Sequence, residues 1–158
     1  MSEISKENLS EIDKRYRTTV FIVLGQIFFV LLLIAAAWIL NLRFQNELAE
    51  KDLTTLWVGV LFVAVGSFLL RRMFFNWERL KNIALLKGVA GLLRTLQRNS
   101  IILGTFAVVV ALLGFVITAF SGNGTDIIRA GAIALVVFLI NFPRRKVWRT
   151  IVSNLGKV

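Results

Sequence analysis

Residues 18–42 read TTVFIVLGQIFFVLLLIAAAWILNL, a stretch of 25 positions without a charged side chain. Residues 99–125 read NSIILGTFAVVVALLGFVITAFSGNGT and extend the same property over 27 positions. A transmembrane helix needs about 20 consecutive, mainly apolar residues. Each stretch is long enough to cross a bilayer, so the sequence predicts an integral membrane protein.

The rest of the chain contains two shorter uncharged stretches. They are residues 53–70, which number 18, and residues 130–143, which number 14. The shorter one reaches spanning length if it is extended outward through Ile127 and Ile128 while Arg129 directs its guanidinium group to the lipid headgroups. With 57% hydrophobic residues in 158 and a mean hydropathy of +0.76, little remains for an extramembrane domain. We expect one transmembrane domain, residues 18–142, with spans at about 18–40, 54–72, 100–120 and 126–142.

The distribution of Lys and Arg predicts the orientation of these spans. Sixteen of the 19 basic residues lie in the segments 1–17, 71–98 and 143–158. The other three are Arg43, Lys51 and Arg129. Because cytoplasmic segments carry the excess of positive charge, both termini are expected in the cytoplasm, which requires an even number of spans. The predicted fold is an all-α polytopic membrane protein, with two in-out-in hairpins in the bacterial cytoplasmic (inner) membrane.

Three polar segments are expected to form amphipathic helices at the inner face. The arm 1–17, the inner connection 73–99 and the basic tail 143–158 each carry apolar residues at helical spacing. In the tail these residues are Trp148, Ile151, Val152 and Leu155. We expect the tail to lie on the membrane surface after Pro143 ends the fourth span. We interpret the inner connection as an interfacial helix, and the alternative is a docking helix for a partner. Gly88 and Gly91 disfavour an unbroken helix there.

A short turn is predicted between the third and fourth spans. Residues 121–125 read SGNGT. We expect Gly122 to end the third span in a left-handed conformation, because glycine adopts that conformation without steric cost. Thr125 is expected to cap the fourth helix, with Asp126 favourable at its positive end.

The basic residues at the inner face form the candidate binding surface. They are Arg71, Arg72, Arg79, Lys81, Arg144, Arg145 and Lys146. One interpretation is that these charges only fix topology, and we give it more weight. The other is that they bind anionic lipid headgroups or an acidic partner. Nucleic acid is not expected as a partner, because the net charge of +10 comes without base-stacking aromatics or a recognisable module.

The residue types exclude most chemistry. The chain has no Cys and no His, which removes disulfides, thiolate catalysis, haem ligation by His and the usual zinc sites. No ionisable residue lies deep in a predicted span, where such groups mark proton relays and transport sites. There is also no Gly-rich phosphate loop, carboxylate pair or nucleophile elbow. We therefore expect no enzymatic activity, no cofactor and no metal.

Two polar residues in the spans follow similar tetrapeptides. Gln26 follows IVLG at 22–25, and Thr105 follows IILG at 101–104. If the two hairpins are an internal repeat, Gln26 and Thr105 lie at the same depth and can hydrogen-bond across the bundle. Helix adhesion is the preferred interpretation of this pair, and a substrate site is the alternative.

Two functions are compatible with these features. The preferred one is a noncatalytic accessory or assembly subunit that packs against a larger bacterial membrane complex. The alternative is a homo-oligomeric pore or small-molecule transporter. The arrangement of four spans in two hairpins resembles that of the small helper subunits encoded with bacterial ATP synthases. This resemblance is one of layout, and it carries over no residues.

Overall fold

The structure, a computed structural model, describes residues 6–40 and 50–155. Almost all of these residues are helical, and none of them is in a strand. The five helices are α1 (Lys6–Leu40), α2 (Glu50–Phe74), α3 (Trp77–Ser121), α4 (Thr125–Asn141) and α5 (Arg145–Leu155). Residues 1–5 of the predicted arm, Arg43 in the loop after the first span, and residues 156–158 of the tail lie outside the described residues.

Four apolar helical stretches are long enough to cross a membrane, which confirms the predicted fold class at this level. The fourth stretch runs over Thr125–Leu155 and includes the break between α4 and α5. From Lys6 onward, the predicted arm and the first predicted span form the single 35-residue helix α1. At 1.5 Å per residue α1 is about 52 Å long, whereas the hydrocarbon core of a bilayer is about 30 Å thick. Part of α1 therefore extends beyond a membrane.

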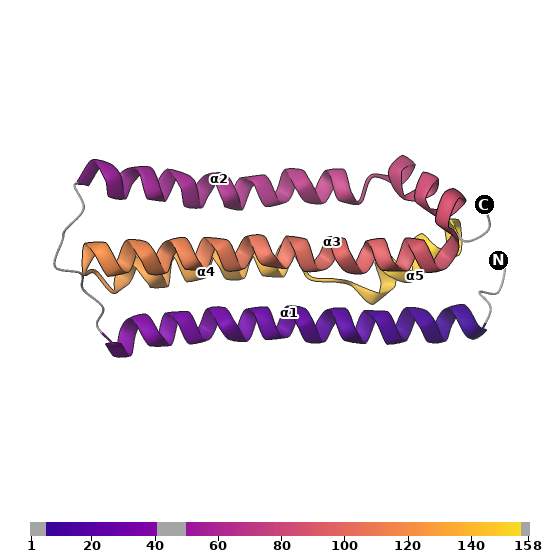
Figure 1. Cartoon of the computed structure of the whole chain (residues 1–158), viewed down its shortest axis with the longest axis horizontal. Coiled ribbons are helices and arrows are strands. Elements are labelled where there is room, and N and C mark those ends of the chain that lie inside the picture. Colours follow the sequence, from indigo (N-terminus) through magenta and orange to yellow (C-terminus); the bar gives the residue numbers. More distant parts are fainter. Residues whose placement is uncertain (1–5, 41–49, 156–158) are drawn as a thin grey trace.

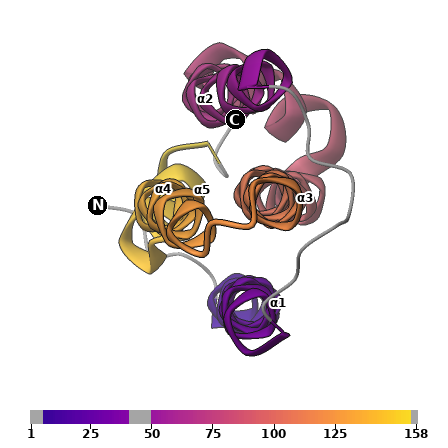
Figure 2. The same ribbon diagram turned by 90° about the vertical axis from the view of Figure 1, so that its left-hand side faces the viewer.

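The helices are arranged around a central pair. Figures 1 and 2 show α3 and α4 side by side, with α1 on one side of the pair and α2 on the other. Both outer helices contact α3 and α4, but within the described residues α1 and α2 do not contact each other. The bundle thus has a diamond-shaped cross-section, in which α3 and α4 lie across the short diagonal.

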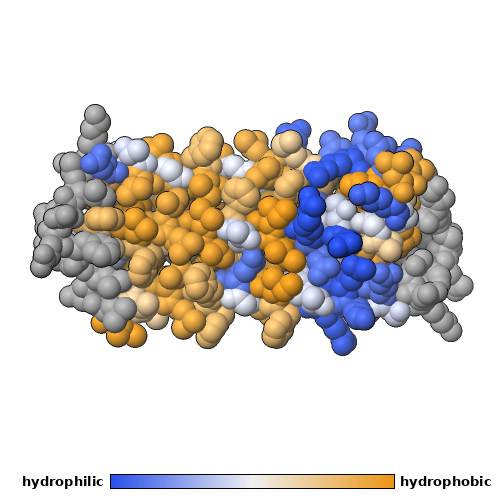
Figure 3. Space-filling view, viewed as in Figure 1, coloured by the Kyte–Doolittle hydropathy of each residue, from blue (hydrophilic) through white to orange (hydrophobic). Residues whose placement is uncertain are grey.

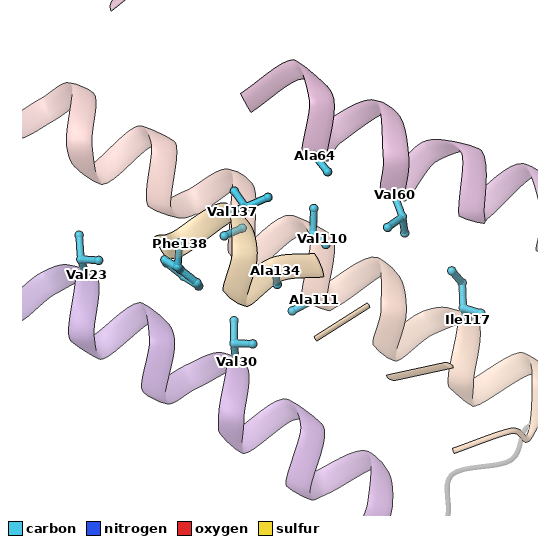
Figure 4. Close-up of a cluster of buried hydrophobic side chains, with 11 residues drawn as sticks. Val23, Val30, Val60, Ala64, Val110, Ala111, Ile117, Ala134, Val137 and Phe138 are labelled. Carbon is cyan, nitrogen blue, oxygen red and sulfur yellow. The ribbon is translucent and has the colours of Figure 1, made fainter. Parts of the chain in front are cut away.

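Small residues allow α3 and α4 to pack closely. A Cβ atom added at Gly114 of α3 would lie only 2.1 Å from the Cβ of Ala130 in α4. Ala107, Ala111 and Ala134 are fully buried in the same core. Valines from the outer helices, among them Val23 and Val30 of α1 and Val60 of α2, point toward this pair (Figure 4). Close backbone approach of this kind is the main source of helix association inside a membrane.

The turn between α3 and α4 agrees with the prediction for Gly122 and differs from the prediction for Thr125. Gly122 ends α3 with φ 64° and donates its N–H to the carbonyl of Thr118 at 2.9 Å, as predicted. Thr125, however, does not cap α4, because the N-cap position is Gly124. The Asn123 side chain instead accepts hydrogen bonds from the Thr125 N–H at 3.1 Å and from its hydroxyl at 2.9 Å. Asn123, two residues after the end of α3, therefore closes this turn in place of Thr125.

The predicted inner connection is the first part of α3. Asn76 caps this helix by accepting a hydrogen bond from the Glu78 N–H at 3.0 Å. The helix then bends at Gly88, whose φ of 63° and ψ of −171° are not helical, so the expected interruption is confirmed there. Beyond the bend, Asn99 donates its Nδ2 hydrogen to the carbonyl of Phe74 at 3.2 Å and so satisfies one of the terminal carbonyls of α2.

Candidate functional site at the basic end

One end of the bundle combines high positive charge with a second hydrophobic core. This basic end comprises the first turns of α1, the last turn of α2, the first half of α3 and all of α5, and Figure 3 shows hydrophilic residues gathered there. A cluster separate from the membrane core lies within it. Its buried members are Ile12, Leu80, Ala84, Leu92, Leu93, Leu96, Trp148, Ile151, Val152 and Leu155. The basic end is thus a packed unit with a hydrophobic cluster of its own.

Helix α5 supplies the apolar face that closes this unit. Trp148 is 1% exposed, and its ring meets that of Tyr16 edge-on with 5.9 Å between centroids. The Tyr16 hydroxyl donates to the carbonyl of Pro143 at 3.3 Å. The tail was expected to lie on the membrane surface, and the structure packs α5 against α3 and α1 with its apolar side chains buried within the chain. The first turns of α1 and the first half of α3 supply the apolar surface for α5, which includes Ile12, Leu92 and Leu96.

An ion-pair cluster joins α1 to α5. Arg145 donates hydrogen bonds to both carboxylate oxygens of Asp13, the one from Nε to Oδ1 at 3.0 Å, and Arg149 lies 3.6 Å from the same Oδ1. The hydrogen bond from Arg145 lowers the pKa of Asp13 below its ordinary value. The sequence made Arg145 a candidate for lipid or partner binding, whereas in the structure it forms an ion pair with Asp13 of the same chain.

The other predicted basic residues fall into different environments. Arg71 and Arg144, which are distant in sequence, line one pocket. The guanidinium carbon of Arg79 lies 5.1 Å from the centre of the Phe74 ring, within the range of a cation–π interaction. Three side chains are exposed and have no acidic partner among the described residues: Arg72, Lys81 and Lys146. The structure therefore brings together two members of the predicted set.

The pocket of Arg71 and Arg144 lies where α2, α3 and the connection from α4 to α5 meet. Its volume is about 130 Å³, and its walls also include Phe75, Asn141, Phe142, Pro143, Val147 and Trp148. Ligand sites for drug-sized molecules measure about 300–1,000 Å³, whereas one water requires roughly 10–15 Å³. The pocket therefore has room for a small polar group but not for a large cofactor. Neither arginine forms an ion pair with a described acidic residue.

Asn141 is the buried polar group of this pocket. Its side chain is 7% exposed, and neither Oδ1 nor Nδ2 has a hydrogen-bond partner in the part of the chain that the structure describes. An unpaired buried amide costs about 1–3 kcal/mol. The neighbouring Ser100 donates its hydroxyl to the carbonyl of Leu96 at 3.0 Å, and no hydrogen bond joins it to Asn141. The amide hydrogens of Asn141 are thus free to bind a group that enters the pocket.

A wider basic groove runs along the first half of α3. It has a volume of about 510 Å³ and is lined by Arg79, Ile83, Lys87, Gly91, Arg94, Thr95 and Arg98. Four of these seven side chains are cationic, and none is acidic. The groove therefore favours an anionic surface. It contains no described buried polar atom that lacks a partner, in contrast to the smaller pocket.

The structure also brings together Gln26 and Thr105. The Nε2 of Gln26 donates to the Thr105 hydroxyl at 3.2 Å and to the carbonyl of Ile101 at 3.4 Å. Its Oε1 is buried against Gly104, where an added Cβ atom would lie 2.1 Å away. These contacts hold α1 against α3 at the depth where the sequence placed the pair.

Two functional residues were missed from the sequence. Asp13 was not singled out, although it is one of four acidic residues in the arm 1–17 and such a residue is a candidate partner for the basic tail. Asn141 was noted only as a polar residue of the fourth span. Its role depends on Arg71, which is 70 positions earlier, and no local pattern reports that proximity.

No group of three or more His, Cys, Asp or Glu residues among those described is arranged to hold a metal ion. Comparison of the chain with protein-family models, curated proteins and solved structures found no match. The contacts of the chain itself are therefore the basis for any functional proposal.

Proposed function

We propose that the protein is a noncatalytic accessory or assembly subunit of a larger bacterial membrane complex. In this proposal the four spans form two in-out-in hairpins in the inner membrane, and both termini are cytoplasmic. The Lys and Arg residues of the basic end support that orientation, because cytoplasmic segments carry such an excess. The basic end then faces the cytoplasm, and the apolar helices carry the contacts with the partner.

The observation that carries the proposal is a division among the glycines of the bundle. A Cβ atom added at Gly104, Gly114 or Gly131 would lie within 2.1–2.5 Å of another side chain, so these glycines serve packing inside the chain. Four others have nothing within 4 Å of such an atom. Gly88 lies at the bend of α3, and the remaining three are inside regular helix: Gly25 in α1, and Gly59 and Gly66 in α2. These three glycines have no packing role within the described residues.

Gly59 and Gly66 mark one face of α2. They are seven residues apart, which places them two turns apart on the same side of the helix. A glycine inside a helix costs about 1 kcal/mol relative to alanine. Small residues on a transmembrane helix let a second helix approach closely, and association there depends on such packing because lipid is as apolar as the side chains. We infer that this face of α2 packs against a helix of the partner.

The test is co-purification in mild detergent at native expression. The wild-type chain is expected to bring a stoichiometric membrane partner, identified by mass spectrometry, and G59L/G66L is expected to lose it while keeping its own fold. V58L/V65L is the matched control, because Val58 and Val65 have the same spacing on an adjacent exposed face. A wild-type chain that purifies alone, or equal loss of the partner in both double variants, would contradict the proposal.

The same experiment addresses the pore or transporter. That function predicts that only further copies of this chain are recovered with the wild type. It also needs polar side chains along a path between copies, and Gln26 instead directs its amide to α3 of its own chain. The accessory subunit is therefore the better supported of the two functions.

A further inference from the structure

We propose that the pocket of Arg71, Asn141 and Arg144 binds the phosphate group of a membrane phospholipid. This inference is independent of the proposed assembly role, since it concerns the basic end and not the outer face of α2. Two arginines line the pocket, and between them their guanidinium groups offer up to ten N–H donors without an acceptor among described acidic residues. Their like charges repel one another until an anion binds.

Asn141 provides the second, independent observation. It lines the pocket, it is more than nine-tenths buried, and both polar atoms of its amide lack a partner among the described residues. A phosphate oxygen can accept a hydrogen bond from Nδ2, while a headgroup hydroxyl can donate to Oδ1. A phosphate ester that carries a hydroxyl therefore satisfies both atoms, which neither a bare apolar chain nor a cation does.

The position of the pocket indicates a lipid as the source of the phosphate. The uncharged stretch of α2 ends at Leu70, immediately before Arg71, and that of α4 ends at Pro143, immediately before Arg144. Both arginines thus lie at the boundary between the apolar spans and the basic end, where the phosphates of one leaflet are located. Phe142 also lines the pocket, on the side of the apolar spans, and is suited to contact the first carbons of an acyl chain.

The size of the pocket limits what enters it. A volume of about 130 Å³ accommodates a phosphate group and adjoining atoms, but it is too small for a nucleotide or a folded partner segment. Charge-assisted hydrogen bonds from arginine to phosphate are shorter and stronger than neutral ones. The pocket therefore suits a phosphate ester that contacts both arginines and Asn141.

The test measures binding of dioctanoyl-phosphatidylglycerol to the full chain in nonionic detergent by native mass spectrometry. The wild type is expected to bind one molecule, and R71Q/R144Q to bind about a hundredfold more weakly, since each charged hydrogen-bonding group contributes about tenfold. The matched control is R72Q/K146Q, which removes the same charge from exposed neighbours outside the pocket and is expected to stay within about threefold of the wild type. An equal loss of lipid affinity in both double variants, or no loss in R71Q/R144Q, would overturn the assignment of lipid binding to this pocket.

Two further arms keep the inference testable if R71Q/R144Q folds poorly. N141L leaves the charges in place and removes both unpaired atoms, and it is expected to weaken lipid binding about tenfold with unchanged helicity. Unchanged binding by N141L would contradict the role of the amide. Inorganic phosphate and glycerol phosphate, tested as competitors, are expected to bind at least about tenfold more weakly than the lipid. Equal binding would assign the site to soluble phosphate and overturn its assignment to lipid.

Discussion

The two halves of the transmembrane bundle use their helices differently. Helices α3 and α4 follow one another through a turn of three residues and pack together (Figure 2). Helices α1 and α2 also follow one another, yet within the described residues they do not touch and lie on opposite sides of the central pair. Adjacency in sequence therefore predicts contact in the second half of the chain and not in the first.

The packing surfaces account for this difference. Gly114 and Ala130 allow α3 and α4 to approach closely, whereas Gly25 of α1 and Gly59 of α2 face open space. The similar tetrapeptides at 22–25 and 101–104 illustrate the point, because the glycine that ends the first is open and the glycine that ends the second is covered by Gln26. A repeated sequence pattern thus occurs in two unlike environments.

The largest expected effect comes from breaking the central pair. In G114L a side chain would be forced against Ala130, whose Cβ lies 2.1 Å from the first added atom. Overpacking of a close interface costs about 3 kcal/mol. We expect the free energy of unfolding to fall by that amount, measured by SDS titration in mixed micelles. The control is G25L, which meets nothing within 4 Å and should unfold much as the wild type does. If G25L were as damaging as G114L, the distinction between the two halves would be lost.

A smaller effect is expected from alanine at the two matched glycines. G25A should stabilise the protein by up to about 1 kcal/mol, because alanine is the better helix former and its methyl group enters open space. G104A gains the same propensity but displaces the Gln26 amide, which costs about 0.6 kcal/mol for the lost hydrogen bond and about 0.5–1.5 kcal/mol for a distorted rotamer. The two variants should differ by about 1–2 kcal/mol in the same titration, with G104A less stable. Equal stabilities would indicate that the two glycines have like surroundings.

The smallest effect concerns the attachment of α1 at the basic end. Only α1 of the two outer helices contacts α5, and Asp13 contributes an ion pair to that contact. Because the pKa of Asp13 is lowered on folding, its contribution is present above the ordinary value of 3.8 and is lost as the pH falls through the lower folded value. Hydrogen exchange of α5 amides, corrected for intrinsic rates, should therefore accelerate below pH 3.8 in the wild type.

The variant D13N separates this effect from general acid unfolding. Its α5 amides should exchange faster than those of the wild type at neutral pH, and they should lose the acid-dependent step. Amides in the centre of α3 serve as the internal reference, and D13N should leave their exchange unchanged. An identical acid dependence in D13N and the wild type would assign the step to another group.

The fold class could be predicted from the sequence because charged residues are costly inside a membrane, so that spans appear as long uncharged stretches. The uncharged stretches at 18–42 and 99–125 establish helices without any knowledge of their neighbours. Gly88 and Gly122 are also readable locally, because both adopt the positive φ that glycine favours. The diamond arrangement could not be predicted, because it depends on which apolar helix faces are complementary in shape. Hydropathy does not distinguish those faces.

The candidate site was predicted in composition but not in geometry. The basic residues around 71 and 144 were identified because clustered charge is visible in the sequence. Their division into an intramolecular pair for Arg145, a pocket for Arg71 and Arg144, and solvent for Lys146 depends on how α5 packs. The tail was predicted to lie on the membrane surface because its apolar face suits that position as well as it suits packing against other helices of the chain. The structure shows that this apolar face packs against α1 and α3.

Disulfide cross-linking of introduced cysteines in native membranes tests the diamond arrangement most directly, because the chain has no cysteine of its own. A disulfide requires Cα atoms within about 7 Å. The pair I34C/G131C should cross-link α1 to α4, since Cγ1 of Ile34 lies 3.1 Å from the position of a Gly131 Cβ. The pair V30C/V60C should not cross-link, because α1 and α2 have no described Cα atoms within 8 Å of each other. Cross-linking of V30C/V60C with none in I34C/G131C would contradict the central placement of α3 and α4.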